Sequence, residues 1–199
     1  MRVKDAICDE LRAQTGTRPK VSKHRPDVQI NVSIHAKKAT IAIDLAGEPL
    51  HKRGYRQEGE NVQAPLKEAL AAGVLLMSPW ARVVEGLRAG TLEPQDCVLV
   101  DPFCGGGTLV IEGAMMAADM APGILRDYWG FSGWRQFDPE VFARLLAEAD
   151  ARLEAGLARM PRIVGSDIDP HAIGIARAQA GRVGLAGFID LAVANCADM

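Results

Sequence analysis

The residues with the clearest chemical potential form one glycine-rich segment near the middle of the chain. Residues 97–108 read Cys-Val-Leu-Val-Asp-Pro-Phe-Cys-Gly-Gly-Gly-Thr: an apolar strand, an acidic residue, a glycine turn and the start of an apolar helix. Glycines let a backbone approach a ligand closely, and the first N–H groups of a helix have no partner within the helix. The segment therefore predicts a site for a nucleotide-like ligand at the carboxyl edge of a parallel sheet.

The spacing of the glycines argues against a dinucleotide dehydrogenase. Those enzymes use Gly-x-Gly-x-x-Gly, in which the third glycine allows a helix to pack tightly on a strand. Gly105 and Gly107 match the first two positions, but Val110 stands at the third. The structural alternative is a glycine turn that only leads into a buried helix.

A second acidic residue follows the next expected strand, residues 162–166. A carboxylate at the end of a neighbouring parallel strand can hold the ribose hydroxyls of an adenosine cofactor, and we predict this role for Asp167. Helix capping is the alternative, but Asp169 already occupies that position before a proline. Because a long segment separates this acid from the glycines, residues 120–160 are expected to form a surface excursion, with the tryptophans and Phe131 as a satellite core beneath it.

A cationic segment precedes the glycine turn. Residues 51–56 read His-Lys-Arg-Gly-Tyr-Arg. Arg53 and Arg56 could bind phosphate while Tyr55 stacks on a base, which predicts an RNA contact at these three residues. The competing interpretation is a linker whose arginines pair with acidic residues and whose tyrosine packs on the face of a domain. Both interpretations stay open at this level.

The composition is that of an ordinary globular protein of 199 residues, with 48% hydrophobic and 24% charged residues. No run approaches the roughly 20 apolar residues needed to span a bilayer, and the N-terminus has no secretory signal. The four cysteines form no Cys-x-x-Cys pair and the four histidines are scattered. The sequence therefore predicts neither a disulfide framework nor a zinc site, and it favours a reducing cytoplasm.

The net charge of -2 is unevenly distributed. Residues 1–60 carry twelve Lys or Arg and eight Asp or Glu, a balance of +4, whereas residues 61–199 carry eleven and seventeen, a balance of -6. A basic N-terminal segment on an acidic body suits an anionic partner such as RNA. Differences of this size also occur in proteins that bind no nucleic acid, so charge alone does not decide the partner.

The first 45 residues predict one helix and one hairpin. Apolar spacing predicts a helix over residues 3–13 with Gly16 as its stop. Alternating apolar residues predict antiparallel strands over 28–34 and 40–45, joined near 36–38. The apolar faces of these strands need the helix and further cover, and a helix with one hairpin makes a poor domain. We therefore expect the chain to begin inside a domain.

Apolar spacing and capping residues predict the remaining elements. A helix that begins at Pro65 has these apolar residues on one face: Leu66, Leu70, Val74 and Met77. Asp138 and Asp169, each followed by proline, predict the N-caps of two further helices. The inner faces expected for these are Phe142, Leu145, Leu146, Ala149 and Leu153, and then Ile173, Ala176, Ala180 and Val183. Residues 188–194 predict a third strand.

The order of motifs resembles that of the THUMP-domain RNA methyltransferases. The matching motifs are His-x-Arg-Gly-Tyr-Arg, Ala-Pro-Leu-Lys-Glu at 64–68, Asp-Pro-Phe-Cys-Gly-Gly-Gly-Thr, Ala-Pro-Gly at 121–123 with Trp-Gly-Phe at 129–131, and Gly-Ser-Asp-Ile-Asp-Pro. The resemblance covers nearly the whole chain. It is greatest to the bacterial enzymes that methylate the exocyclic amine of a guanine in large-subunit (23S) ribosomal RNA.

The resemblance implies a fold and a division into domains. Residues 1–47 would be the end of an α+β THUMP RNA-binding domain, and residues 48–61 a linker. Residues 62–199 would be the first part of an α/β, Rossmann-like methyltransferase domain that depends on S-adenosylmethionine. The partner implied is ribosomal RNA.

The glycine motif itself resembles the first motif of amino-methyltransferases, Asp-Pro-Phe-x-Gly-Ser-Gly-Thr, and so implies S-adenosylmethionine as the cofactor. The residues predicted to contact it are Asp101, Pro102, Phe103, Cys104, Gly105, Gly107, Thr108, Asp167, Ile168 and Asn195. Asp101 would face the methionine end of the cofactor or order the turn, and Cys104 would pack as a small residue. Asn195 or Asp198 would bond the adenine amino group or serve as a loop residue.

The chain departs from the family pattern in three ways. Gly106 stands where serine is usual, and Asn195 where the family more often has aspartate. The family's Asn-Pro-Pro-aromatic motif, which holds the flipped base, does not occur in these 199 residues. We therefore predict no catalytic residue in this chain, little methyl transfer by the chain alone, no metal site and no membrane contact. The sequence leaves the oligomeric state open.

Two other functions stay open. A DNA adenine-N6 methyltransferase uses the same glycine motif for an amine target in DNA. A non-catalytic module would bind S-adenosylmethionine or RNA without carrying out chemistry.

Overall fold

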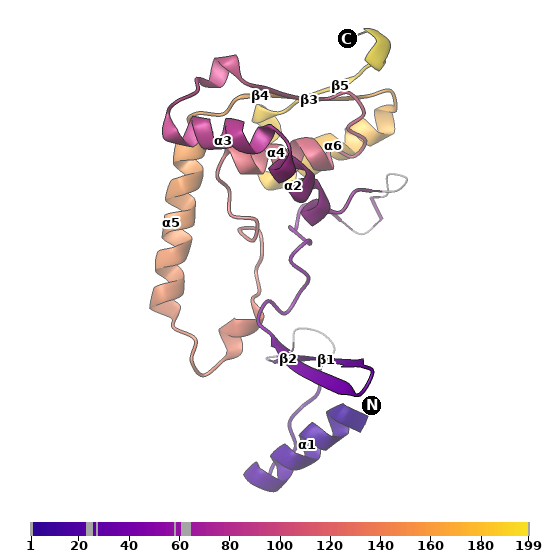
Figure 1. The fold of residues 1–199 in the computed structure, drawn as a ribbon, viewed down its shortest axis with the longest axis vertical. Coiled ribbons are helices and arrows are strands. Elements are labelled where there is room, and N and C mark those ends of the chain that lie inside the picture. Colours follow the sequence, from indigo (N-terminus) through magenta and orange to yellow (C-terminus); the bar gives the residue numbers. More distant parts are fainter. Residues whose placement is uncertain (1, 23–25, 27, 58, 61–64, 199) are drawn as a thin grey trace. The chain divides into compact units, whose positions relative to one another are not determined.

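The chain divides into two units, which we describe separately (Figure 1). The structure is a computed structural model that describes residues 2–22, 26, 28–57, 59–60 and 65–198. The first unit comprises residues 1–48 and 128–137, and the second comprises 49–127 and 138–199. The segment predicted as a linker, residues 48–61, therefore belongs to the second unit from Pro49 onward.

The first unit contains the predicted helix and hairpin. Helix α1 spans Arg2–Thr15, and strands β1, Gln29–His35, and β2, Lys38–Asp44, pair antiparallel. The two-residue loop has a positive φ at its first position, Ala36, which a type II′ turn requires. Local sequence signals therefore suffice to place these three elements.

The hairpin has one apolar and one polar face, because paired residues and every second residue point to the same side. Ile30 pairs with Ile43 and Val32 with Ile41 on the apolar face. The polar face consists of Gln29, Asn31, Ser33 and His35 on β1, with Asp44, Ala42, Thr40 and Lys38 opposite on β2. The apolar face stays largely exposed among the described residues, with Ile34 72% and Ile41 64% exposed.

The aromatic segment joins the first unit. The sequence predicts it as a satellite core beneath a surface excursion, but Gly130 N–H donates to Ala46 O at 3.1 Å and Phe131 N–H to Leu45 O at 3.0 Å. The rings of Trp129 and Phe131 stack with centroids 5.6 Å apart. These backbone bonds lie next to the end of β2, so the segment packs on the hairpin unit.

The second unit is built on a parallel sheet of three strands in the order β3-β4-β5. The strands are Val98–Asp101, Arg162–Asp167 and Asp190–Val193. Asp101 pairs with Gly165 of β4, and Asp167 pairs with Val193 of β5. The strands predicted at 98–100 and 162–166 are confirmed, and β5 is shorter than the predicted 188–194.

The described part of the second unit contains five α-helices, of which α5 runs away from the sheet while the others lie beside it (Figure 1). They are α2 Glu68–Met77, α3 Trp80–Ala89, α4 Thr108–Ala117, α5 Pro139–Leu157 and α6 Pro170–Val183. Short 3-10 turns occupy Pro94–Asp96, Gly130–Gly133, Ala186–Phe188 and Cys196–Asp198. Helix α4 is buried along most of its length, including Val110 and Ile111, and each such side chain contributes about 1.5–3 kcal/mol.

The face predicted for helix α2 is wrong, because the helix buries a different one. It begins at Glu68 rather than Pro65 and buries Ala71 and Leu75. Met77 is 93% exposed, and Leu70 and Val74 are also exposed. The sequence Glu-Ala-Leu-Ala-Ala-Gly-Val-Leu-Leu-Met is apolar nearly all round, so its pattern does not select the face that packs.

The two capped helices start as predicted. The Asp138 carboxylate accepts from the backbone N–H groups of Glu140 and Val141 at 2.9 and 3.1 Å, and Asp169 accepts from His171 N–H at 2.9 Å. The inner face of α6, Ile173, Ala176, Ala180 and Val183, is buried. In α5 the prediction is wrong for Leu145 and Leu146, which are exposed, because the helix contacts the core only through its C-terminal part.

No single helix among the described residues is long and apolar enough to cross a membrane. Helices α2 and α3 meet that test of length and composition only as a pair bent by 77°.

Candidate functional site

The glycine turn lies at the carboxyl edge of the sheet, between β3 and α4. Cys104 N–H donates to Ser166 O of β4 at 2.9 Å, and Gly107 N–H closes the turn on Cys104 O at 2.8 Å. Gly105 and Gly107 have positive φ values of 52° and 80°, conformations that side chains disfavour. Gly107 is also the N-cap of α4 and supplies no side-chain cap.

Asp167 lies at the end of β4 and contacts this turn directly. Its Oδ2 accepts from Gly105 N–H at 2.9 Å, and its Oδ1 accepts from Asp169 N–H at 3.0 Å. Each carboxylate oxygen has two lone pairs, so both can accept a further hydrogen bond. Asp169 caps α6, as the sequence predicts, and this leaves Asp167 at the rim of the turn.

Asp101, the last residue of β3, orders the start of the turn. Its Oδ1 accepts from Phe103 N–H at 3.1 Å. Burial raises the pKa of this carboxyl above its usual value, and the negative charge of Asp167 adds to the effect. The structure thus displays one of the two roles predicted for Asp101, the ordering of the turn.

Cys104 is buried against the neighbouring strand. A Cβ added at Gly165 would lie 3.2 Å from its Sγ. Burial raises the pKa of the Cys104 thiol to about 12, with further contributions from Asp101 and Asp167. Burial of this kind favours the neutral thiol over the reactive thiolate.

Exposed apolar side chains and open space lie at the same edge of the sheet. Phe103 is 71% and Ile168 70% exposed, and a Cβ added at Gly105 would meet nothing within 4 Å. Asn195 follows β5, is exposed, and accepts from Ala197 N–H through Oδ1 at 3.1 Å. The side chain of Asp198 lies outside the described part of the chain.

These groups fit an adenosine-type nucleoside. A carboxylate at the end of β4 suits sugar hydroxyls, and two exposed apolar side chains suit the faces of a base. The open space beside Gly105 gives a ligand access to the backbone of the turn. Among the described residues no group of three or more His, Cys, Asp or Glu side chains is placed to hold a metal ion.

The cationic segment packs inside the second unit. The Tyr55 ring is 0% exposed, and its hydroxyl donates to Glu112 of α4 at 3.1 Å. The Arg53 guanidinium pairs with the same carboxylate at 3.2 Å. A fully buried ring has no face free for a base, so the stacking role predicted for Tyr55 is not retained; these contacts match the competing interpretation.

Arg56 reaches the start of α4. Its Nη2 donates to Thr108 Oγ1 and to Leu66 O, both at 2.5 Å, and its Nε lies 3.4 Å from Glu68. Burial raises the pKa of the Glu112 carboxyl, and the hydrogen bond and positive charge of Arg53 partly lower it. Sequence reasoning did not select Glu68 and Glu112. The available signal was a single acidic residue in each of two otherwise apolar helices.

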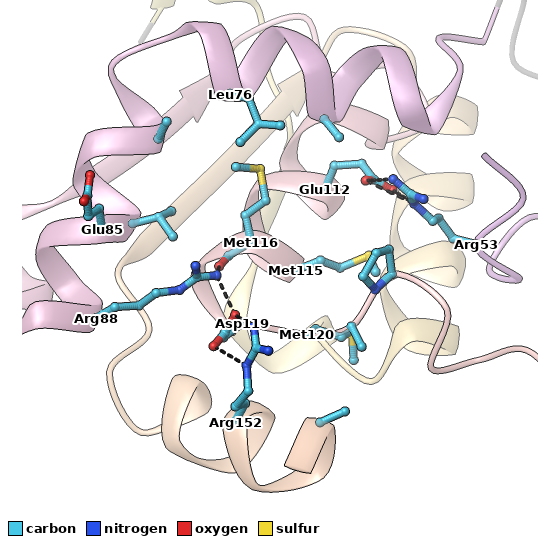
Figure 2. Close-up of a pocket in the computed structure, with 16 residues that line it drawn as sticks. Arg53, Leu76, Glu85, Arg88, Glu112, Met115, Met116, Asp119, Met120 and Arg152 are labelled. Atoms are coloured by element: carbon cyan, nitrogen blue, oxygen red, sulfur yellow. Dashed lines mark hydrogen bonds and ion pairs between the residues drawn. The ribbon is translucent and has the colours of Figure 1, made fainter. Parts of the chain in front are cut away.

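A separate pocket of about 710 Å³ lies along the C-terminal half of α4 (Figure 2). The Arg53–Glu112 pair lies at one end, and at the other Asp119 forms ion pairs with Arg88 and Arg152. The apolar side chains of Met115, Met116, Met120 and Leu76 also line it. Its lining contains none of the residues of the glycine turn, so the pocket and the turn are separate.

Comparison with family models decides the relationship. Residues 53–199 match the model described as "RMKL-like, methyltransferase domain", and residues 1–44 match the THUMP domain. The chain belongs to the RMKL-like methyltransferase family. The mixed α/β fold with a parallel sheet, preceded by a THUMP domain, agrees with the resemblance drawn from the motifs.

Individual members of the RMKL-like family support this assignment. The chain is 49% identical, over 93% of its length, to the ribosomal RNA large subunit methyltransferase K/L of Syntrophotalea carbinolica, and 46% identical over 100% to that of Methylococcus capsulatus. It spans about a quarter of the length of these relatives, 24% and 25%. The crystal structure of a protein assigned as a methyltransferase, complexed with SAH, matches 98% of this chain with a TM-score of 0.77 and 34% identity. The matched region makes up 47% of that protein's chain.

Proposed function

We propose that this chain carries the cofactor site of a methyltransferase that transfers a methyl group from S-adenosylmethionine to the exocyclic amine of a guanine in ribosomal RNA. The contact between the Asp167 carboxylate and Gly105 N–H is the observation that supports the proposal most, because a carboxylate beside the glycine turn suits the sugar hydroxyls of a nucleoside. Support comes from the 49% identity to a ribosomal RNA large subunit methyltransferase K/L.

Each residue at the sheet edge would contact a different part of the cofactor. Asp167 would accept from the ribose hydroxyls, Phe103 and Ile168 would contact the adenine, and Asn195 would bond its amino group. Asp101, Pro102, Cys104 and the backbone of Gly105, Gly107 and Thr108 would shape the turn around the methionine end. The cofactor supplies an electrophilic methyl group, and we assign no catalytic residue within this chain.

We further propose the division of the chain into an RNA-binding part over residues 1–47 and a cofactor-binding part over 62–199. The described cysteines are free thiols, which suits the reducing cytoplasm that the sequence favours.

The tip of the hairpin is the surface we propose for the RNA backbone. Ser33 pairs with Thr40 and His35 with Lys38 on the polar face, and Lys37 lies in the loop. Together with Ala36 these residues line a hollow of about 450 Å³ that has no acidic side chain in its lining. Hydroxyl and amine donors around a hollow suit phosphate oxygens, which proteins bind mainly through such groups.

Removing the two hairpin lysines tests this surface. In the full-length protein, Lys37→Ala with Lys38→Ala should weaken RNA binding by about ten- to thirtyfold near 0.1 M salt. The slope of log K against log salt should shrink by about 1.4–1.8, because each lost phosphate contact removes about 0.7–0.9. A matched double variant at exposed sites, Lys20→Ala with Lys67→Ala, should leave the slope nearly unchanged. Equal changes in both variants would contradict the assignment to the hairpin.

The reaction itself is tested with the protein expressed from its complete gene. We expect transfer of a labelled methyl group to unmodified ribosomal RNA, at guanine N2, with no transfer to DNA of matched length. The 199-residue chain alone should show little or no transfer. Methylation of adenine in DNA would favour the alternative enzyme, and cofactor binding without transfer to either nucleic acid would favour the non-catalytic module.

A further inference from the structure

We infer that Arg56 is a positioning residue for the cofactor site, and that it acts by holding the first residue of α4 through its hydrogen bond to Thr108. The inference rests on the proposed function, since it concerns the turn at which we place the cofactor. It assigns to the His-x-Arg-Gly-Tyr-Arg segment a role in ligand affinity in addition to packing.

One short segment contacts the same helix at two of its residues. Arg56 bonds Thr108 at the start of α4, and Arg53 and Tyr55 bond Glu112 four residues later. Residues four apart lie on one face of a helix, so both contacts act on the same side of α4. Thr108, Glu112 and Glu68 are all buried, so these bonds form away from bulk water.

Other contacts fix the segment itself. Arg182 of α6 donates to Tyr55 O at 2.9 Å and forms a salt bridge with Glu60. The Tyr55 side chain belongs to the hydrophobic core. The segment is therefore attached to α4 and α6, the two helices that follow the strands carrying Asp101 and Asp167.

The start of α4 lacks an ordinary side-chain cap, and the side-chain hydrogen bond at its first residue comes from Arg56. Gly107 is the N-cap residue and has no side chain to accept the first N–H groups. Among the described residues, Arg56 is the hydrogen-bond partner of the Thr108 hydroxyl. Thr108 directly follows the glycine whose φ of 80° sets the turn, so movement of Thr108 displaces the backbone that would face the cofactor.

Electrostatics also argue against a role for Arg56 in helix stability alone. A cation near the N-terminus of a helix is disfavoured by the helix dipole. Glu68 offsets part of this cost from α2, at 3.4 Å from the Arg56 Nε. Arg53 differs, because it pairs with Glu112 inside α4. The two arginines therefore predict different consequences when they or their partners are changed.

The test is a double-mutant cycle on SAH affinity, measured by isothermal titration calorimetry with the full-length protein. Arg56→Met should raise Kd about tenfold or more, since a hydrogen bond from a charged donor is lost. Thr108→Val should raise it to a similar extent, and the double variant should be no weaker than the weaker single variant. Arg56→Lys should recover part of the affinity, because an ammonium group also donates to a hydroxyl.

Glu112→Gln is the matched control. It breaks a buried pair on the same helix face and should lower the melting temperature at least as much as Arg56→Met, yet leave Kd within about twofold. Thr108→Val keeps the shape of the side chain, so its Kd for SAH tests the inference even if Arg56→Met does not fold. An unchanged Kd in Thr108→Val would overturn the inference.

The outcomes separate the inference from the function on which it rests. Independent, multiplicative effects of Arg56→Met and Thr108→Val on Kd would show a purely structural role for Arg56, as would an equal rise in Kd for Glu112→Gln. If the unmodified full-length protein binds no SAH, the proposed function fails, and the inference fails with it.

Discussion

Replacing Asp167 by alanine is expected to weaken SAH binding by at least about a hundredfold. The substitution removes the carboxylate proposed to accept from the ribose and leaves Gly105 N–H without its partner, a contact of 2.9 Å. A hydrogen bond to a charged group contributes about 1.5–3 kcal/mol, and each 1.4 kcal/mol corresponds to a factor of ten in Kd. Calorimetric titration of the full-length protein measures the loss.

Two neighbouring variants define what the Asp167 result means. Asp169→Ala removes the cap of α6 and should cost about 1 kcal/mol of folding free energy, while Kd changes less than twofold. Asp167→Asn keeps an oxygen that can accept from Gly105 N–H but loses the charge, and should lie between the wild-type protein and the alanine variant. Unchanged SAH affinity in Asp167→Ala would remove the sugar-binding role of this residue.

The second large effect is expected at Gly107, where alanine should lower the free energy of unfolding by about 2–5 kcal/mol. A residue other than glycine at its φ of 80° carries about 1–2 kcal/mol of strain. The new Cβ would also approach Ala176 Cβ of α6 to 2.9 Å and its Cα to 3.4 Å, and such overpacking costs about 1–3 kcal/mol more. Denaturant unfolding of the full-length protein measures the change.

Gly184 offers a matched control for Gly107. It has φ 80° and ψ 14°, against φ 80° and ψ 11° at Gly107, but a Cβ there would meet nothing within 4 Å. Gly184→Ala should therefore show the backbone strain alone. If Gly107→Ala lowers the free energy of unfolding no more than Gly184→Ala does, α6 has shifted to accommodate the new Cβ. Close contact between the turn and α6 is then not required.

Much of the secondary structure and the position of the candidate site follow from local sequence. Asp138 and Asp169 cap their helices because an acceptor side chain before a proline satisfies the first free N–H groups wherever it occurs. The hairpin follows from alternation with period two. The glycine turn and Asp167 meet because adjacent parallel strands end at the same edge of a sheet. The caps and the alternation act over a few residues, whereas the meeting of Gly105 with Asp167, 62 residues apart, needs the parallel pairing of β3 and β4.

The partners of the cationic segment required the tertiary structure. Arg53 and Arg56 carry the same charge and lie three residues apart, yet one pairs with Glu112 and the other contacts Thr108. The sequence separation of more than fifty residues leaves no local pattern that would distinguish these partners from a phosphate group. The burial of Tyr55 likewise depends on which helices surround it.

The amino-acid sequence by itself determined the starts of the capped helices, the two faces of the hairpin and the glycine turn beside an acidic residue, because backbone geometry and short-range hydrogen bonds fix such features. Only the tertiary structure decided that α2 buries Ala71 and Leu75, that Leu145 stays exposed and that the cationic segment faces inward. Burial depends on which surfaces pack together in the folded chain. An apolar helix can pack through several of its faces, and a long arginine side chain can reach several partners, so local sequence does not decide either outcome.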